Sequence, residues 1–142
     1  MKPIVLVLTL LLASPLVAQQ DASEPTESSE LMALVDQFYN SIRAGDREGY
    51  ADVFVDDFVF TWSGDGGVWA PESIFPNVAP TPDLVVLIDE VVTRSYGDAA
   101  LINFRQRSSE EEPGVRVTFS LVRLSGEWKA MSYQSTAIPE GN

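Results

Sequence analysis

The stretch ELMALVDQFYNSIRAGD, residues 30–46, decides the fold of this chain. Gly45 stands where a helix would end, because glycine adopts the left-handed conformation of a C-cap at no steric cost. Asp46 is a typical N-cap for a second helix. The apolar residues before them recur at spacings of three and four, which places them on one face of an α-helix; they are Leu31, Leu34, Val35, Phe38 and Ile42. Such a helix needs an apolar surface to pack against.

The remainder of the chain is patterned as a short helix and then as strands. Tyr50, Val53 and Phe54 give the second helix an apolar face, and we expect it to end near Asp56-Asp57. A brief third helical piece is expected near Pro71 to Phe75, because proline suits the first position of a helix. Two or three helices and a run of hairpin-connected strands predict an α+β fold, with the helices on one face of an antiparallel sheet. Stretches rich in aromatic and β-branched residues indicate the strands; they span residues 58–63, 68–69, 84–96, 99–108, 115–124 and 128–137.

The first eighteen residues have the pattern of a secretory signal peptide. Lys2 precedes a nearly pure apolar run, residues 4–12, and Ala18 supplies a small residue for cleavage. The run is shorter than the roughly 20 residues that span a bilayer. We therefore expect a secreted or periplasmic protein, with no membrane association after cleavage. The expected divisions are a signal peptide at 1–18, a flexible acidic tether at 19–29, the folded domain at 30–138 and a tail at 139–142.

The composition excludes several kinds of chemistry. The chain has no cysteine and no histidine, which removes thiol nucleophiles, disulfides and the commonest general base. Loss of Lys2 from the nine basic residues leaves eight against 21 acidic ones, a net charge of −13. That charge argues against nucleic acid as a partner. We expect no cofactor and no metal site. Asp56-Asp57 is better explained as helix-terminal than as a calcium site, which needs several spaced oxygen ligands.

Four short motifs, in this order and spacing, carry a family resemblance. They are Ala44-Gly45-Asp46, then Phe54 with Asp56-Asp57, then Tyr96-Gly97-Asp98-Ala99-Ala100, and finally Gly126-Glu127-Trp128. The chain resembles the nuclear transport factor 2-like superfamily, which includes the SnoaL-like and ketosteroid isomerase-like proteins, and is most similar to the domain of unknown function 4440 group. The resemblance implies a cone-shaped α+β barrel. In it a curved antiparallel sheet wraps the N-terminal helices and leaves a pocket at the wide end.

The isomerase branch of this superfamily needs an aspartate base and an oxyanion hole made by a tyrosine and a protonated aspartic acid. The resemblance puts these roles at Phe38, Trp62 and Ser120, and none of the three side chains can perform them. Gln134 stands where SnoaL-like proteins often have a histidine. We therefore expect no inherited catalytic residue.

The resemblance also implies which residues line the pocket. Arg105 could hold a carboxylate ligand through a bidentate contact, or it could pair with a nearby acid or point to solvent. Trp62, Trp69 and Phe75 could form an aromatic lid over an apolar ligand, or they could fill the core. The predicted lining consists of Phe38, Phe54, Trp62, Leu101, Asn103, Arg105, Ser120 and Tyr133.

Hydrophobic alternation conflicts with this choice of sheet face. A one-residue change of register exchanges the two faces of a strand, and alternation favours burial of Ala100, Ile102 and Phe104 instead. Both faces would be covered if helices lay on one and a second copy on the other. We therefore expect a homodimer through the sheet. The apolar row that would meet the second copy continues through Val117, Phe119 and Leu121, and Phe119→Arg should give a monomer.

Three functions are compatible with the sequence. The first is a non-catalytic binder, or accessory protein, for an apolar or carboxylate-bearing small molecule. The second is an isomerase, lyase or cyclase that uses a non-inherited residue such as Asp89 or Tyr133. Asp89-Glu90 is otherwise explained as a solvated strand edge. The third is a protein-interaction module that works through the apolar sheet face.

Overall fold

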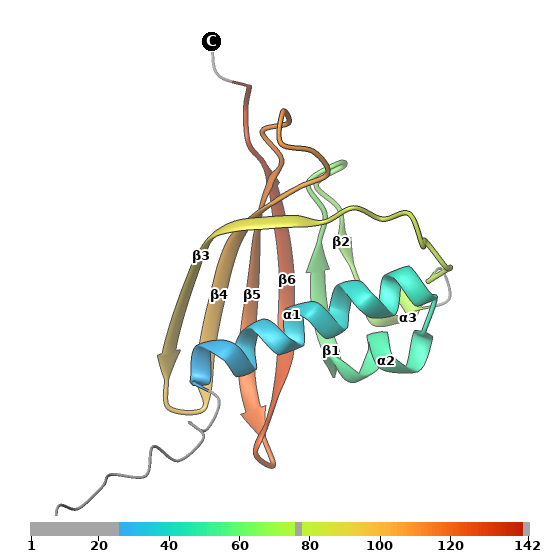
Figure 1. The fold of residues 1–142 in the computed structure, drawn as a ribbon. Coiled ribbons are helices and arrows are strands. Elements are labelled where there is room, and N and C mark those ends of the chain that lie inside the picture. Colours follow the sequence, from blue (N-terminus) through green and yellow to red (C-terminus); the bar gives the residue numbers. More distant parts are fainter. Residues whose placement is uncertain (1–25, 76–77, 141–142) are drawn as a thin grey trace, which may run out of the picture.

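The structure, a computed structural model, describes residues 26–75 and 78–140. The predicted signal peptide and residues 19–25 of the predicted tether lie outside these described residues. Figure 1 shows the helices gathered on one face of a curved sheet. The elements are α1 Glu27–Ala44, α2 Arg47–Asp52, β1 Phe54–Thr61, β2 Val68–Trp69, α3 Pro71–Ile74, β3 Leu87–Tyr96, β4 Ala99–Arg107, β5 Val115–Leu124 and β6 Glu127–Ala137.

The six strands form one sheet in the order β2-β1-β6-β5-β4-β3. Neighbouring strands are antiparallel except for β1 and β6, which pair in parallel. The α+β class is thus confirmed, and the sheet is mixed where we predicted an antiparallel one. Hairpin signals could not reveal the parallel pair, because β1 meets the last strand of the chain rather than a neighbour in sequence.

Helix α1 lies across one face of the sheet (Figure 1). It ends as predicted, with Gly45 in the left-handed conformation at φ 67°. It begins at Glu27 rather than at Glu30, because Thr26 O accepts bonds from Ser29 N at 2.7 Å and from Ser29 Oγ at 2.7 Å. Residues 27–29 of the predicted tether are therefore helical. No helix within residues 26–75 and 78–140 is long and apolar enough to cross a bilayer.

Helix α2 is shorter than predicted. Asp46 caps it as expected, since its Oδ1 accepts from Gly49 N at 3.0 Å. The helix stops at Asp52 because the next residues join the sheet: Ala130 N donates to Val53 O at 2.8 Å, and Phe54 pairs with Ala130. Asp56-Asp57 is therefore part of β1, in the irregular stretch before Val59 where the register shifts, and not the end of a helix.

The face of the sheet under α1, the concave face, holds the core. Phe119 is fully buried there, and its ring centroid lies 5.3 Å from that of Phe38. The predicted apolar row of Val117, Phe119 and Leu121 is thus the interior of the monomer, and its expected role in meeting a second copy is wrong. The physical reason is that alternation follows the face that α1 covers. Phe119→Arg would place a charge in the core instead of separating two copies.

Candidate ligand pocket

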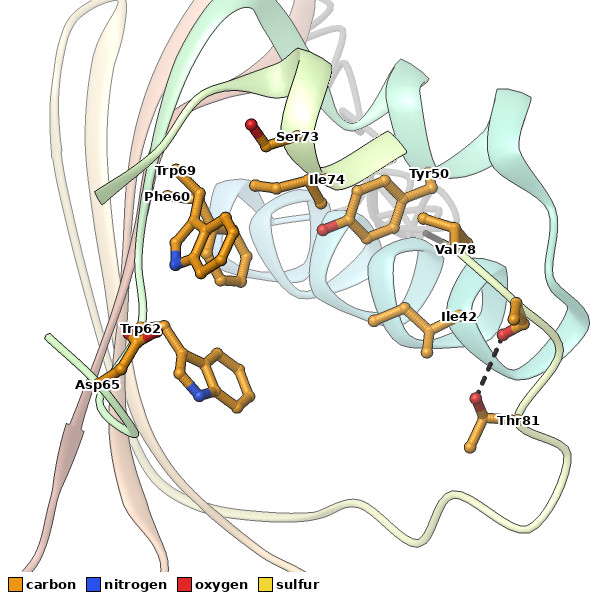
Figure 2. Close-up of a pocket in the computed structure, with 11 residues that line it drawn as sticks. Ile42, Tyr50, Phe60, Trp62, Asp65, Trp69, Ser73, Ile74, Val78 and Thr81 are labelled. Carbon is orange, nitrogen blue, oxygen red and sulfur yellow. Dashed lines mark hydrogen bonds between the residues drawn. The ribbon is translucent and has the colours of Figure 1, made fainter. Parts of the chain in front are cut away.

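A pocket of about 490 Å³ opens on the concave face, at the end where α2, α3 and the β1–β2 hairpin lie (Figure 1), hereafter the wide end. Its walls come from the end of α1, from α2 and α3, from the β1–β2 hairpin and from residues 78–81 (Figure 2). The lining is mostly apolar, as in most small-molecule sites. It consists of Ile42, Tyr50, Phe60, Trp62, Asp65, Trp69, Ser73, Ile74, Val78, Ala79 and Thr81.

The β1–β2 hairpin carries two tryptophans to the rim of this pocket. Phe60 pairs with Trp69 across the two strands, so both side chains face α1. Trp62 follows the end of β1, and its ring stacks on Phe60 with centroids 6.1 Å apart. Trp62 is 48% exposed and Trp69 41%, so these two indoles border the cavity and do not fill the core. Phe75 does not border the cavity in this way, because its ring packs against those of Tyr50 and Phe58.

The turn of this hairpin holds Asp65 in place. Trp62 N donates to Gly67 O at 3.1 Å, and Gly66 N donates to Trp62 O at 3.0 Å. Gly66 has φ 68°, a left-handed conformation that favours glycine. Asp65 Oδ1 accepts from Gly67 N at 2.7 Å, which orients the carboxylate within the turn. The glycine-rich sequence therefore builds a rigid rim that carries one negative charge.

Tyr50 contributes a phenol to the pocket wall. Its side chain is only 3% exposed, and its ring packs against Phe38 and Phe54 at centroid distances of 5.3 and 5.4 Å. Figure 2 shows the hydroxyl directed into the cavity. The hydroxyl has no hydrogen-bond partner among residues 26–75 and 78–140. Burial raises the pKa of Tyr50 above its ordinary value, and Tyr133 raises it further, so the phenol stays protonated.

Tyr133 lies behind the pocket wall rather than in it. Its ring stacks on Phe60 with centroids 4.2 Å apart. Burial raises the pKa of Tyr133 to about 12, against the opposing effect of hydrogen bonds with Ser135 and Tyr39. Tyr39 in turn donates to Gln106 Oε1 at 3.2 Å. The Tyr39 hydroxyl is therefore already used within the protein, and Tyr133 is buried behind the wall.

Residues 78–81 are fastened to the helices and form the far wall. Arg47 Nε donates to Val78 O at 3.3 Å, and Thr81 N donates to Arg43 O at 3.2 Å. Pro80 lies directly over Gly45: a Cβ at Gly45 would come within 2.6 Å of Pro80 Cγ. The C-cap of α1 is thus also the support for this wall.

Four predicted pocket residues lie on the opposite, convex face of the sheet. Leu101 is 37% exposed, whereas its neighbours Ala100 and Ile102 are buried under α1. The choice of face for these strand residues was therefore wrong, and hydrophobic alternation was the correct guide, because a single shift of register exchanges the faces. The four are Leu101, Asn103, Arg105 and Ser120.

On the convex face Arg105 is engaged by acids. It donates to Asp89 Oδ1 at 2.6 Å and to Oδ2 at 2.9 Å, and it lies 3.3 Å from Glu90. Arg107 donates to the same carboxylate at 2.6 Å. The Arg105 hydrogen bond, with help from Arg107, lowers the pKa of Asp89 to about 2. Asp89 is therefore a poor base, and Arg105 is occupied away from the pocket.

Of the eight predicted lining residues, Trp62 alone borders the cavity. Phe38, Phe54 and Tyr133 form the layer behind it. Two lining residues were not predicted. Tyr50 was interpreted only as an apolar helix residue, and Asp65 only as part of a turn. Within the described residues no group of three His, Cys, Asp or Glu is placed to hold a metal ion.

Solved structures share this architecture at low sequence identity. An NTF2-like (nuclear transport factor 2-like) protein from Cytophaga hutchinsonii is 16% identical, over 79% of this chain and 98% of its own, with a TM-score of 0.63. An NTF2-like protein of unknown function from Shewanella baltica is 17% identical, over 84% and 100%, with a TM-score of 0.58. A protein of unknown function with a cystatin-like fold from Nostoc punctiforme is 18% identical, over 82% and 96%, with a TM-score of 0.62.

The chain therefore has the nuclear transport factor 2-like fold. It belongs to the SnoaL-like domain family, whose family model matches residues 31–139. Comparison with curated proteins gives no match.

Proposed function

We propose that this protein binds a small, largely apolar molecule in the wide-end pocket and does not convert it chemically. The observation that carries the proposal is the Tyr50 hydroxyl, which is directed into the cavity (Figure 2) and has no hydrogen-bond partner among the described residues. This donor faces the open cavity, where water can bind it. An acceptor on a ligand, such as a carbonyl or ether oxygen, would take the place of that water.

The size and chemistry of the cavity support an apolar ligand. Its volume of about 490 Å³ falls within the range of small-molecule pockets, about 300–1,000 Å³. The sequence suggested either an apolar or a carboxylate-bearing ligand, and the carboxylate-bearing ligand is disfavoured. Arg105, its expected partner, is bound to Asp89 on the convex face, and the described residues that line the pocket include no lysine or arginine.

A binding role is also favoured by the state of the candidate catalytic groups. Phe38 and Trp62 have no proton to exchange, and Ser120 lies on the convex face. Asp89 is held as a carboxylate by two arginines, and burial keeps the Tyr133 phenol protonated by raising its pKa. Nothing among these groups forms a general base next to the cavity.

Titration with acetophenone, an aromatic ketone, tests the proposal. We expect quenching of tryptophan fluorescence with saturable binding, and Tyr50→Phe should weaken that binding by about 3–10-fold, the equivalent of one neutral hydrogen bond. Native mass spectrometry of the purified protein should detect a retained ligand. The proposal fails if no neutral aromatic compound binds at millimolar concentration, or if Tyr50→Phe binds acetophenone as well as the wild type.

The proposal includes the compartment in which the protein is found. We propose that the protein is secreted or periplasmic, on the strength of Lys2, the apolar run 4–12 and Ala18. N-terminal sequencing of the protein from fractionated cells would test it, with Gln19 as the expected first residue.

Within the family, the Gly45-Asp46 and Gly97-Asp98 motifs support placement in the domain of unknown function 4440 group.

We further propose that a second copy covers the convex face. Val59, Val92 and Leu101 are exposed apolar residues on that face, among small polar ones. The informative variant is Leu101→Arg rather than Phe119→Arg, because Leu101 lies outside the core. Solution scattering should give the mass of a dimer for the wild type and of a monomer for Leu101→Arg. A wild type that is monomeric would refute the dimer, and a heterologous partner on the same face would support an interaction role instead.

A further inference from the structure

The pocket has opposite chemical character at its two ends. Its inner wall offers a neutral donor, the Tyr50 hydroxyl, surrounded by apolar side chains. Its mouth is formed by Trp62, Asp65 and Trp69 on the β1–β2 hairpin. Among the described residues that line the pocket, Asp65 is the single charged one. A ligand that fills the pocket therefore meets one fixed charge, and that charge is negative.

The Asp65 carboxylate is not neutralised by the rest of the described chain. Its Oδ1 accepts from Gly67 N, and no lysine or arginine within residues 26–75 and 78–140 forms an ion pair with it. Arg43 and Arg47 lie on the helical side of the pocket, where they donate to the carbonyl oxygens of Leu84 and Val78. Neither is among the lining residues. With a net charge of −12, the whole chain adds to the negative potential at this site.

The two indoles beside Asp65 suit the same kind of ligand group. Trp62 is 48% exposed and Trp69 41%, so part of each indole is accessible to a ligand in the cavity. The face of an indole carries negative charge density and attracts cations, with tryptophan the strongest of the aromatic residues. Figure 2 shows both indoles bordering the cavity, with Asp65 adjacent to Trp62.

We propose that the ligand carries an organic ammonium group, held at the mouth by Trp62, Trp69 and Asp65, while its apolar body extends inward toward Tyr50. This inference rests on the proposed binding function and names the class of its ligand: a tertiary or quaternary amine with an apolar body. Quaternary ammonium groups suit such a mouth because they are weakly hydrated and present apolar methyl groups to the indoles.

The test compares phenyltrimethylammonium with tert-butylbenzene, which has the same shape and no charge. Binding is followed by the indole N–H signals of the three tryptophans in ¹⁵N-labelled protein. Trp62 and Trp69 should shift, and Trp128, which is packed under Arg123 with the guanidinium carbon 4.5 Å from its ring centroid, should not. We expect the cation to bind about tenfold more tightly than the neutral isostere.

Asp65→Asn is the decisive variant, because asparagine keeps the oxygen that accepts from Gly67 N and removes only the charge. It should reduce the preference for the cation to about threefold or less. Asp98→Asn, in the β3–β4 turn at the opposite end of the sheet, makes the same change in net charge and should leave the preference intact.

The outcomes separate the two proposals. Equal binding of the two compounds, or an unchanged preference in Asp65→Asn, would overturn the ammonium inference and leave the pocket as a binder of neutral molecules. Failure of both compounds to shift Trp62 and Trp69 would overturn the proposed binding function as well.

Discussion

The two faces of the sheet differ in how their charged groups are paired. On the convex face, Asp89 accepts hydrogen bonds from both Arg105 and Arg107, and Asn103 Nδ2 donates to Thr118 Oγ1 at 2.7 Å. At the wide end of the concave face, Asp65 accepts from Gly67 N but has no ion-pair partner among the described residues, and the Tyr50 hydroxyl has no hydrogen-bond partner there. Proteins depart from internal pairing mainly at functional sites. The contrast supports the wide-end pocket as the candidate site.

The largest effect should come from truncating a side chain on the buried face, compared with the same kind of change on the convex face. Phe119→Ala removes a fully buried ring and should lower the free energy of unfolding by about 3–5 kcal/mol. Leu101→Ala, one strand away on the convex face, should change it by less than about 1 kcal/mol in the monomer. Urea denaturation measures both. Similar losses for the two variants would contradict the assignment of faces.

A smaller effect should follow from loosening the pocket wall without touching its lining. Gly45→Ala puts a Cβ at a residue with φ 67° and against Pro80, and should cost at least about 1–2 kcal/mol. Because Pro80 would have to move, ligand affinity should fall together with stability. Thermal unfolding and acetophenone titration check the two effects. Gly97→Ala is the matched control: its φ is 66°, but its Cβ would meet no atom within 4 Å, so its strain should leave affinity unchanged.

Two buried tyrosines sharpen the comparison further. Tyr39→Phe removes a hydroxyl that donates to Gln106 Oε1 and should cost about 1 kcal/mol. Tyr50→Phe removes a hydroxyl that has no described partner and faces the open cavity, so it should change the free energy of unfolding of the ligand-free protein by less than about 0.5 kcal/mol. Urea denaturation of ligand-free protein gives both values. A loss of stability in Tyr50→Phe would mean that this hydroxyl is satisfied within the protein.

The smallest effect is a pH dependence on the convex face. The pKa of Asp89 is lowered from 3.8 to about 2 by Arg105 and Arg107, so its pairing stabilises the fold above about pH 4. That contribution is lost as the pH falls from about 4 to about 2, since the carboxyl is then protonated in the folded state too. The difference in Tm between the wild type and Asp89→Asn should therefore shrink across this window. A constant difference down to pH 2 would contradict the pairing.

Local patterns in the sequence were sufficient to predict most elements. The spacing of Leu31, Leu34 and Phe38 predicted α1, and Gly45-Asp46 predicted both its end and the start of α2. These features depend on residues close in sequence, where caps and periodicity act directly. Residues 115–124 were assigned to a strand with the observed bounds for the same reason.

The arrangement of the site could not be predicted in the same way. Phe54 was assigned to a helix because nothing near it in sequence reveals its pairing with Ala130. Arg105 was placed in the pocket because one residue of register decides its face. Tyr50 was missed because an apolar helix position does not show whether a hydroxyl finds a partner. Each error concerns contacts between distant parts of the chain.

The parallel pairing of β1 with β6 has a consequence for folding. Strands β3 to β6 follow one another as antiparallel hairpins, so they can form from local contacts. Strand β1 has only β2 and β6 as neighbours, and β6, Glu127–Ala137, is the last of the six described strands. The hairpin that carries Trp62 and Trp69 therefore has no strand to dock against until all the other strands of the sheet have been synthesised. The pocket is the part of this sheet that is completed last.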